Sequence, residues 1–189
     1  MMKKHLFYIA FAALAFSGCK NPYEKELAQL EAVRKTLSAA DSVLAITNAA
    51  EAERLAKEVR NNLQLVQFNI NKIGDTIDFK TALLLTEFRS LAKSLESVEK
   101  SHKRIGMAVD SAANNLGNLE HDLMNKSLAK EFTAEAAVAA ERRQAEDLYG
   151  RAKNLPLQLS TIKAGYDTLA PAINNYLAEL KRRLAEKTK

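Results

Sequence analysis

Apolar residues recur along this chain at alternating intervals of three and four, the spacing that places side chains on one face of an α-helix. Each such set of residues is called a stripe below. The first stripe consists of Leu30, Val33, Leu37, Ala40 and Leu44. A second stripe, out of phase with the first, consists of Ala49, Ala52, Ala56, Val59, Leu63, Val66, Ile70 and Ile73. Both stripes predict helices that bury one face.

The change of phase between these two stripes falls at Ala45–Asn48 and leaves two interpretations open. No glycine or proline lies there, which favours one long helix with a kink or a register shift. However, Asn48 and Glu51 have the spacing of a capping box, in which an amide side chain caps a new helix. A turn at Thr47–Asn48 would therefore give a four-helix protein.

Three other positions carry signals for helix ends. Asn21 as the cap and Pro22 in the first helical position predict the start of the first helix. The sequence Gly74–Asp78 predicts a turn, because glycine readily ends a helix and aspartate caps the next one. The polar stretch Asn125–Thr133 predicts a second turn, and its final threonine can cap the last helix.

The two remaining stripes are the longest. The third predicts one helix from about Phe79 to Asn125, and its members are Leu84, Phe88, Leu91, Leu95, Val98, His102, Ile105, Val109, Ala112, Leu116, Leu119 and Leu123. The fourth keeps its phase across Pro156 and Pro171, where an interior proline is expected to bend the helix. Its members are Val138, Glu141, Ala145, Leu148, Ala152, Leu155, Leu159, Ile162, Tyr166, Leu169, Ile173, Tyr176 and Leu180.

Three long segments joined by two short turns predict an all-α fold, an elongated antiparallel three-helix bundle with coiled-coil-like packing. Six glycines, three prolines and no tryptophan agree with a chain of long helices. Each segment of roughly 50 residues would be about 75 Å long. Residue 19 and the turn at Asn125–Thr133 should then lie at one end of a single domain, 19–189. The turn at Gly74–Asp78 and the C-terminus should lie at the other end.

Residues 1–18 have the features of a cleaved secretory signal peptide. Lys3 and Lys4 precede the apolar run Leu6–Phe16, which is too short to span a bilayer as a helix. A serine and a glycine then lead directly to Cys19, the only cysteine of the chain. This ending resembles the lipobox of bacterial lipoproteins, in which a cysteine is lipidated and becomes the mature N-terminus. The resemblance implies that Cys19 is the lipidation site.

Over the mature chain, the layout resembles small, mostly uncharacterised helical lipoproteins of Gram-negative cell envelopes. Besides the lipobox, the segments LLLTEFRSLAKSLESVEK and LGNLEHDLMNK carry the likeness. The resemblance implies an anchor in a lipid bilayer but no particular activity. Lys20 is not the aspartate associated with retention in the inner membrane, which implies an anchor in the outer membrane. Residues 20–24 lack the acidic tract that directs some lipoproteins to the cell surface, which implies that the bundle faces the periplasm.

Charge and motifs limit the chemistry of the mature chain. Residues 1–18 carry two lysines and no acid, so removal of this segment lowers the net charge of the chain from +5 to +3. This small positive charge is a weak indication of an acidic partner and no indication of nucleic acid. Glu99 and His102 have the spacing of di-iron ligands, but no such glutamate precedes His121, so we expect no metal. His102 is instead interpreted as a polar residue that sets the register of the core. No motif for a catalytic residue or cofactor is present, so we expect no enzyme.

The candidate contacts with a partner protein lie at the predicted far end: Asp75, Thr76, Asp78, Lys181, Arg182 and Arg183. A non-enzymatic structural or adaptor protein of the cell envelope is the favoured function. The alternative is a periplasmic chaperone-like binder of envelope clients. An exposed apolar groove on a monomer would favour the chaperone, whereas a complete core with polar outer faces would favour the adaptor. The sequence leaves the oligomeric state open.

Overall fold

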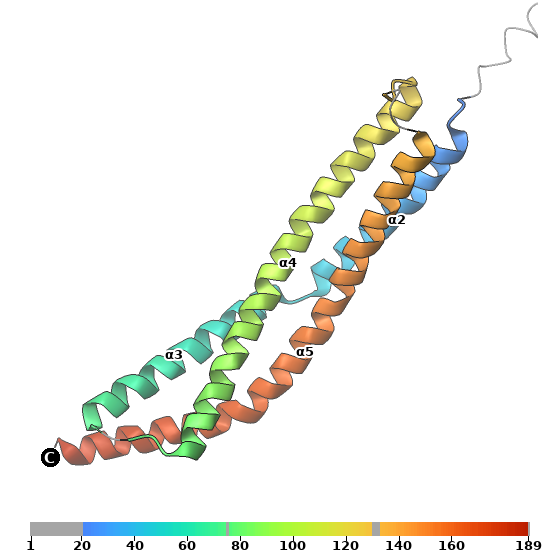
Figure 1. The fold of residues 1–189 in the computed structure, drawn as a ribbon. Coiled ribbons are helices and arrows are strands. Elements are labelled where there is room, and N and C mark those ends of the chain that lie inside the picture. The colour runs from blue at the N-terminus through green and yellow to red at the C-terminus, as the bar shows by residue number, and fades with distance from the viewer. Residues whose placement is uncertain (1–20, 75, 130–132, 189) are drawn as a thin grey trace, which may run out of the picture.

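The computed structural model describes residues 21–74, 76–129 and 133–188. Residues 1–20, which include the expected signal peptide and Cys19, lie outside the described residues, as does Asp75. The described chain forms four helices: α2 (Glu24–Ile46), α3 (Ala49–Ile73), α4 (Phe79–Asn125) and α5 (Ala134–Lys187). They pack into an elongated bundle, which confirms the predicted all-α fold class (Figure 1).

Three helices are packed together at each level of this rod. The long helices α4 and α5 lie side by side along its whole length, while α2 completes one half and α3 the other (Figure 1). α2 packs more extensively against α5, and α3 packs more extensively against α4. With 47 residues, α4 is about 70 Å long at a rise of 1.5 Å per residue.

The junction between α2 and α3 corrects the favoured expectation of one long first helix. At Thr47 the backbone is extended, with ψ 112°, and its N–H donates to the carbonyls of Val43 and Leu44. The Asn48 side chain then accepts a hydrogen bond of 3.0 Å from the backbone N–H of Glu51 and so starts α3. The chain continues in the same direction along the rod (Figure 1). The alternative with four helices is therefore the right one, without a reversal.

The start of α2 also differs from the sequence prediction. The helix begins at Glu24, so neither Asn21 nor Pro22 is its first cap or first turn. The Asn21 side chain instead accepts a hydrogen bond of 3.0 Å from the N–H of Tyr23, which forms a turn of the Asx type before the helix. This turn uses the oxygen atom that would otherwise cap a helix.

The other predicted helix ends are confirmed. Gly74 ends α3 in the left-handed conformation, with φ 69°, where a residue without Cβ is favoured. The carboxylate of Asp78 accepts a hydrogen bond of 3.0 Å from the N–H of Thr81 at the start of α4. Thr133 caps α5 through a bond of 3.2 Å from the N–H of Ala136.

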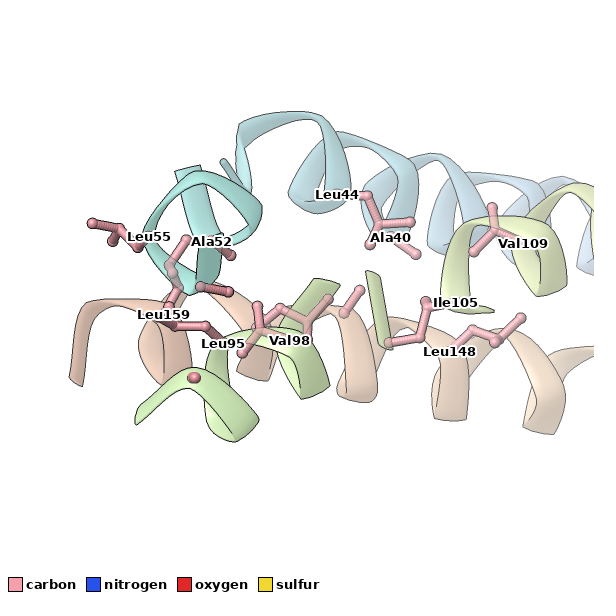
Figure 2. Close-up of a cluster of buried hydrophobic side chains, with 14 of the residues drawn as sticks. Ala40, Leu44, Ala52, Leu55, Leu95, Val98, Ile105, Val109, Leu148 and Leu159 are labelled. Atoms are coloured by element: carbon pink, nitrogen blue, oxygen red, sulfur yellow. The ribbon is translucent and has the colours of Figure 1, made fainter. Parts of the chain in front are cut away.

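The apolar stripes form the core that the pattern predicts. Figure 2 shows this core around the junction, where Leu44 of α2 and Ala52 of α3 lie over Val98 of α4 and Leu159 of α5. Every residue of the first stripe is buried, and the other stripes are buried or half-buried. α5 stays helical through both interior prolines and curves along its length (Figure 1). Leu55 and Leu177 are buried outside the predicted stripes.

Ion pairs connect the two shorter helices, α2 and α3, to the long helices α4 and α5. Arg34 of α2 lies 2.5 Å from Glu120 of α4, and the carboxylate of Glu120 raises the pKa of the Arg34 guanidinium. Lys163 of α5 lies 2.6 Å from Glu51 of α3. Because these side chains are partly exposed, each pair contributes little stability on its own. The apolar stripes that α2 and α3 bury set the rotation of these helices, and the ion pairs are compatible with it.

Candidate functional site

One contact between distant segments marks each end of the rod, and the topology agrees with the one expected from the sequence. Near one end, the Asn21 side chain donates a hydrogen bond of 3.1 Å to the carbonyl of Leu123, close to the C-terminus of α4. At the other end, Lys187 donates a bond of 2.6 Å to the carbonyl of Ile73. The first is called the proximal end below, and the second the distal end. Figure 1 shows the C-terminus at the distal end, beside α3.

Thr76 and Asp78, two of the predicted contacts with a partner, lie in the described part of the distal turn. The side chain of Asp78 already has hydrogen-bond partners within the protein. The Asp78 carboxylate accepts hydrogen bonds from both the backbone N–H and the hydroxyl of Thr81. These bonds, the hydroxyl bond first, lower the pKa of Asp78. Thr76 is exposed. Asp78 therefore has a structural role, whereas Thr76 remains accessible.

One residue of the predicted basic cluster at the end of α5, Arg182, is paired with acids of the same helix. Arg182 lies 2.8 Å from Glu179 and 2.6 Å from Glu186, and these contacts raise its pKa. Arg183 is half-buried, and Lys181 is exposed. The cluster thus presents less free positive charge than its sequence suggests.

The distal end exposes apolar side chains that the sequence reasoning missed. Phe79 is 85 % exposed and Leu83 is 50 % exposed, one turn apart on α4, and Ile77 lies just before them in the turn. These three residues are called the distal patch. Phe79 and Leu83 lie outside the apolar stripe of α4, and this position is the signal in the sequence that could have pointed to them. Exposed apolar groups that gather in one place are typical of interaction surfaces.

The histidine that resembles a metal ligand has a structural partner. The Nε2 atom of His102 lies 3.0 Å from the carbonyl oxygen of Leu44, in the last turn of α2. His102 thereby connects α4 to a backbone group of α2 next to the junction. His121 is exposed and lies 3.0 Å from the Asn125 amide. Within residues 21–74, 76–129 and 133–188, no three side chains of His, Cys, Asp or Glu gather as metal ligands would.

A polar network near the junction connects α5 to α3. The Tyr166 hydroxyl donates a hydrogen bond to Glu58, which also pairs with Arg54 at 3.1 Å. Burial, and then the bond to Glu58, raises the pKa of Tyr166 to about 12. The tyrosine ring stacks on Phe88, with 6.1 Å between the ring centroids. Tyr166 is therefore protonated at neutral pH and holds two helices together.

Glu141 is the one stripe member of α5 that carries a carboxylate. Its side chain is half-buried, and burial raises its pKa. No hydrogen-bond partner of its buried Oε2 atom is found in the part of the chain that the structure describes. An unsatisfied oxygen at this position makes ionised Glu141 unfavourable for the fold.

A shallow groove of about 450 Å³ follows the outer surface between α4 and α5, near the level of the junction. It has an apolar floor and a rim of hydroxyl and amide groups. Its lining residues are Ser94, Ser97, Val98, Leu157, Gln158, Thr161 and Ile162. On the α4 side, Ser97 also belongs to a second, more polar depression that contains Lys93, Lys100 and Arg104.

Comparison with family models, with curated proteins and with solved structures found no match to this chain. The helices in the described ranges include none that is long and apolar enough to cross a membrane.

Proposed function

We propose that this chain is a lipid-anchored helical rod of the bacterial cell envelope, where it acts as a non-enzymatic adaptor for a partner protein. The observation that supports this proposal is the separation of two features along the rod. Asn21, two residues after the expected lipidation site at Cys19, contacts the proximal end. The distal patch lies at the opposite end of the rod, one length of α4 away from the proximal end.

The anchor part of the proposal follows from the short distance along the chain between Cys19 and the folded body. Two residues span at most about 7 Å, so lipid on Cys19 would place the proximal end directly at the membrane surface. Each buried methylene of an acyl chain contributes about 0.8 kcal/mol, and several chains would make the attachment almost permanent. The lipid would lie in the outer membrane, and the rod would extend into the periplasm.

The adaptor part of the proposal follows from what the distal end exposes. Phe79 is 85 % exposed, although a phenylalanine of an isolated soluble rod gains nothing from contact with water. Its neighbours in the distal patch, Ile77 and Leu83, enlarge the apolar area. A partner protein that covers this patch would remove the area from water at about 70 Å from the anchor, given the length of α4.

The anchor is tested by intact-mass measurement of the protein purified from cells, together with fractionation of inner and outer membranes. We expect the mass of residues 19–189 plus acyl chains, and recovery with the outer membrane. The control is Cys19→Ser, which should be neither lipidated nor recovered with membranes. An unmodified Cys19 in the periplasmic fraction would contradict the anchor.

The groove between α4 and α5, with its apolar floor, is a feature that would favour the alternative, a chaperone-like binder, so the two functions are distinguished by their clients. Purified protein should leave the aggregation of unfolded envelope proteins unchanged if it is an adaptor. Suppression of aggregation for several unrelated clients, and its loss in Phe79→Gln, would contradict the adaptor and support the chaperone.

A further inference from the structure

We propose that the outer groove between α4 and α5 binds an acidic amphipathic helix of a partner protein. This inference deepens the proposed adaptor role and rests on it, because it names the chemistry of a partner. Its test measures binding in solution, so its failure is distinguishable from failure of the lipid anchor or of contact at the distal end.

The groove has the shape and floor that a helix requires. Val98, Leu157 and Ile162 supply its apolar floor, and neither α2 nor α3 contributes to its lining. Leu157 is 69 % exposed, although it lies between two buried neighbours of the same helix, Leu155 and Leu159. Helices pack by placing side chains into the grooves of their neighbours, and α2 and α3 already use the inner side of α4 and α5 in this way. The outer side offers the same geometry to another helix.

Positive charge borders this groove on the α4 side. Lys93, Lys100 and Arg104 are exposed and are seven and four positions apart, which places them on one face of α4. Within the described ranges, no carboxylate forms an ion pair with any of the three. Glu96, an acid in the same stretch, is already paired with Arg60 of α3 at 2.5 Å. These three cations are called the basic stripe.

The α5 side of the groove adds no negative charge. Residues 148–166 of α5 contain no aspartate or glutamate, while Arg151, Lys153 and Lys163 are cations. Arg151 and Lys163 have acidic partners within the protein, at Asp147 and Glu51 respectively. The groove is therefore bordered by unpaired positive charge, and the complementary occupant is acidic.

An acidic helix fits these features together better than the other occupants. Its apolar face would cover the floor, and acids at intervals of seven and four residues along one edge would lie opposite the basic stripe. The cations are spaced about 10 Å and 6 Å apart along the axis, a spacing that a helix lying parallel to α4 reproduces. A small molecule would remain largely exposed in so shallow a groove. A polyanion would use the basic stripe but not Leu157.

The test uses the full-length chain, purified in a non-ionic detergent, and a fluorescent synthetic helix as the probe. The probe has about six helical turns, with leucines along one face and glutamates beside them. A second peptide, in which lysines replace the glutamates, is the control probe. Fluorescence anisotropy at two salt concentrations measures affinity, and we expect micromolar binding of the acidic probe alone, weaker at high salt.

The variants separate the charged border from the apolar floor. Lys93→Gln, Lys100→Gln and Arg104→Gln together should weaken binding about tenfold, since exposed charges each contribute modestly. Leu157→Gln should weaken it about fivefold, because the leucine face of the probe loses its contact. All four residues are exposed, so circular dichroism should show an unchanged fold.

A matched control removes the same charges elsewhere. Lys25→Gln, Lys35→Gln and Arg142→Gln are exposed positions on α2 and on the first half of α5, and this triple variant should bind the probe within about twofold of the unchanged chain. An affinity that this control reduces as much as the first triple variant would overturn the proposal.

Three further outcomes would also overturn it. The first is no binding of the acidic probe, and the second is binding that Leu157→Gln leaves unchanged. The third is equal affinity for inorganic polyphosphate or for vesicles of phosphatidylglycerol and phosphatidylcholine. That result would identify an unspecific polyanion or lipid surface instead of a site for a helix.

Discussion

The clearest stability prediction compares two phenylalanines of the same helix. Phe88 is completely buried, and its ring stacks on Tyr166, whereas Phe79 at the start of α4 is 85 % exposed. Phe88→Ala should destabilise the fold by about 3 to 5 kcal/mol, the cost of a cavity left by a core phenylalanine. About 0.5 to 1.5 kcal/mol of that loss belongs to the ring stack. Phe79→Ala should change the free energy of unfolding by less than about 0.5 kcal/mol.

Urea denaturation, followed by circular dichroism, measures the free energy of unfolding of both variants, and thermal denaturation measures their melting temperatures. For a domain of this size, each kcal/mol lowers the melting temperature by about 2 to 4 °C, so Phe88→Ala should melt at least roughly 6 °C lower. The slope of the free energy of unfolding against urea concentration should be the same for both variants and the unchanged chain, since the same surface is exposed on unfolding. Equal losses for the two variants, or a loss below about 1 kcal/mol for Phe88→Ala, would refute the packing described here.

Four smaller perturbations address the junction, the turns and the core. Asn48→Ala removes the cap of α3 and should lower stability by about 1 kcal/mol in urea denaturation, with no loss indicating that the cap is unimportant. His102→Ala removes the bond to the Leu44 carbonyl and should cost about 1 kcal/mol; a loss of stability only in the presence of added metal would contradict this role. Lys126, which follows α4, has φ 57°, a left-handed conformation that favours glycine. Lys126→Gly should therefore raise the free energy of unfolding by about 0.5 to 1 kcal/mol, and the melting temperature should rise with it. Because burial raises the pKa of Glu141, the folded state favours its protonated form, and stability falls as the pH rises from the unfolded pKa of about 4.3 through the higher folded value. Glu141→Gln should therefore stabilise the protein at pH 7 and lose that advantage near pH 4; a gain that is constant with pH would contradict the burial argument.

The sequence predicts the long helices well because their signals are local and agree with one another. The stripe that contains Phe88 has a regular period, Asp78 supplies a cap before it, and both ends of α4 fall where expected. Leu116 and Leu159, members of the third and fourth stripes, are buried as predicted. Their burial depends on the helical period alone, which the sequence contains in full.

The junction could not be decided from the sequence because two local effects of similar size oppose each other. Helix continuation gains backbone hydrogen bonds, whereas the cap at Asn48 gains its bond to Glu51, each about 1 kcal/mol. The outcome depends on packing: α2 lies mainly against α5 and α3 mainly against α4, so the break lets both helices bury their own stripes. Asn21 illustrates the same limit, because its amide also bonds to Leu123, distant in the sequence.

The surface features were predictable only in part. The pairing of Arg182 with acids three positions before and four after it follows from helix geometry, and so does the common face of Lys93, Lys100 and Arg104. That the basic stripe borders an apolar groove could not be predicted, because the groove depends on how α5 is rotated against α4. The exposure of Phe79 also depends on the packing of the distal turn.

The adaptor role is tested most directly by crosslinking in living cells from the two ends of the rod. A photoreactive amino acid replaces Phe79 at the distal end in one strain and Met124, 61 % exposed near the proximal end, in another. We predict that one envelope protein is captured from position 79 and that the same protein is not captured from position 124. Capture of the same protein from both positions, or of many unrelated proteins from position 79, would contradict a rod that presents its distal end to a partner.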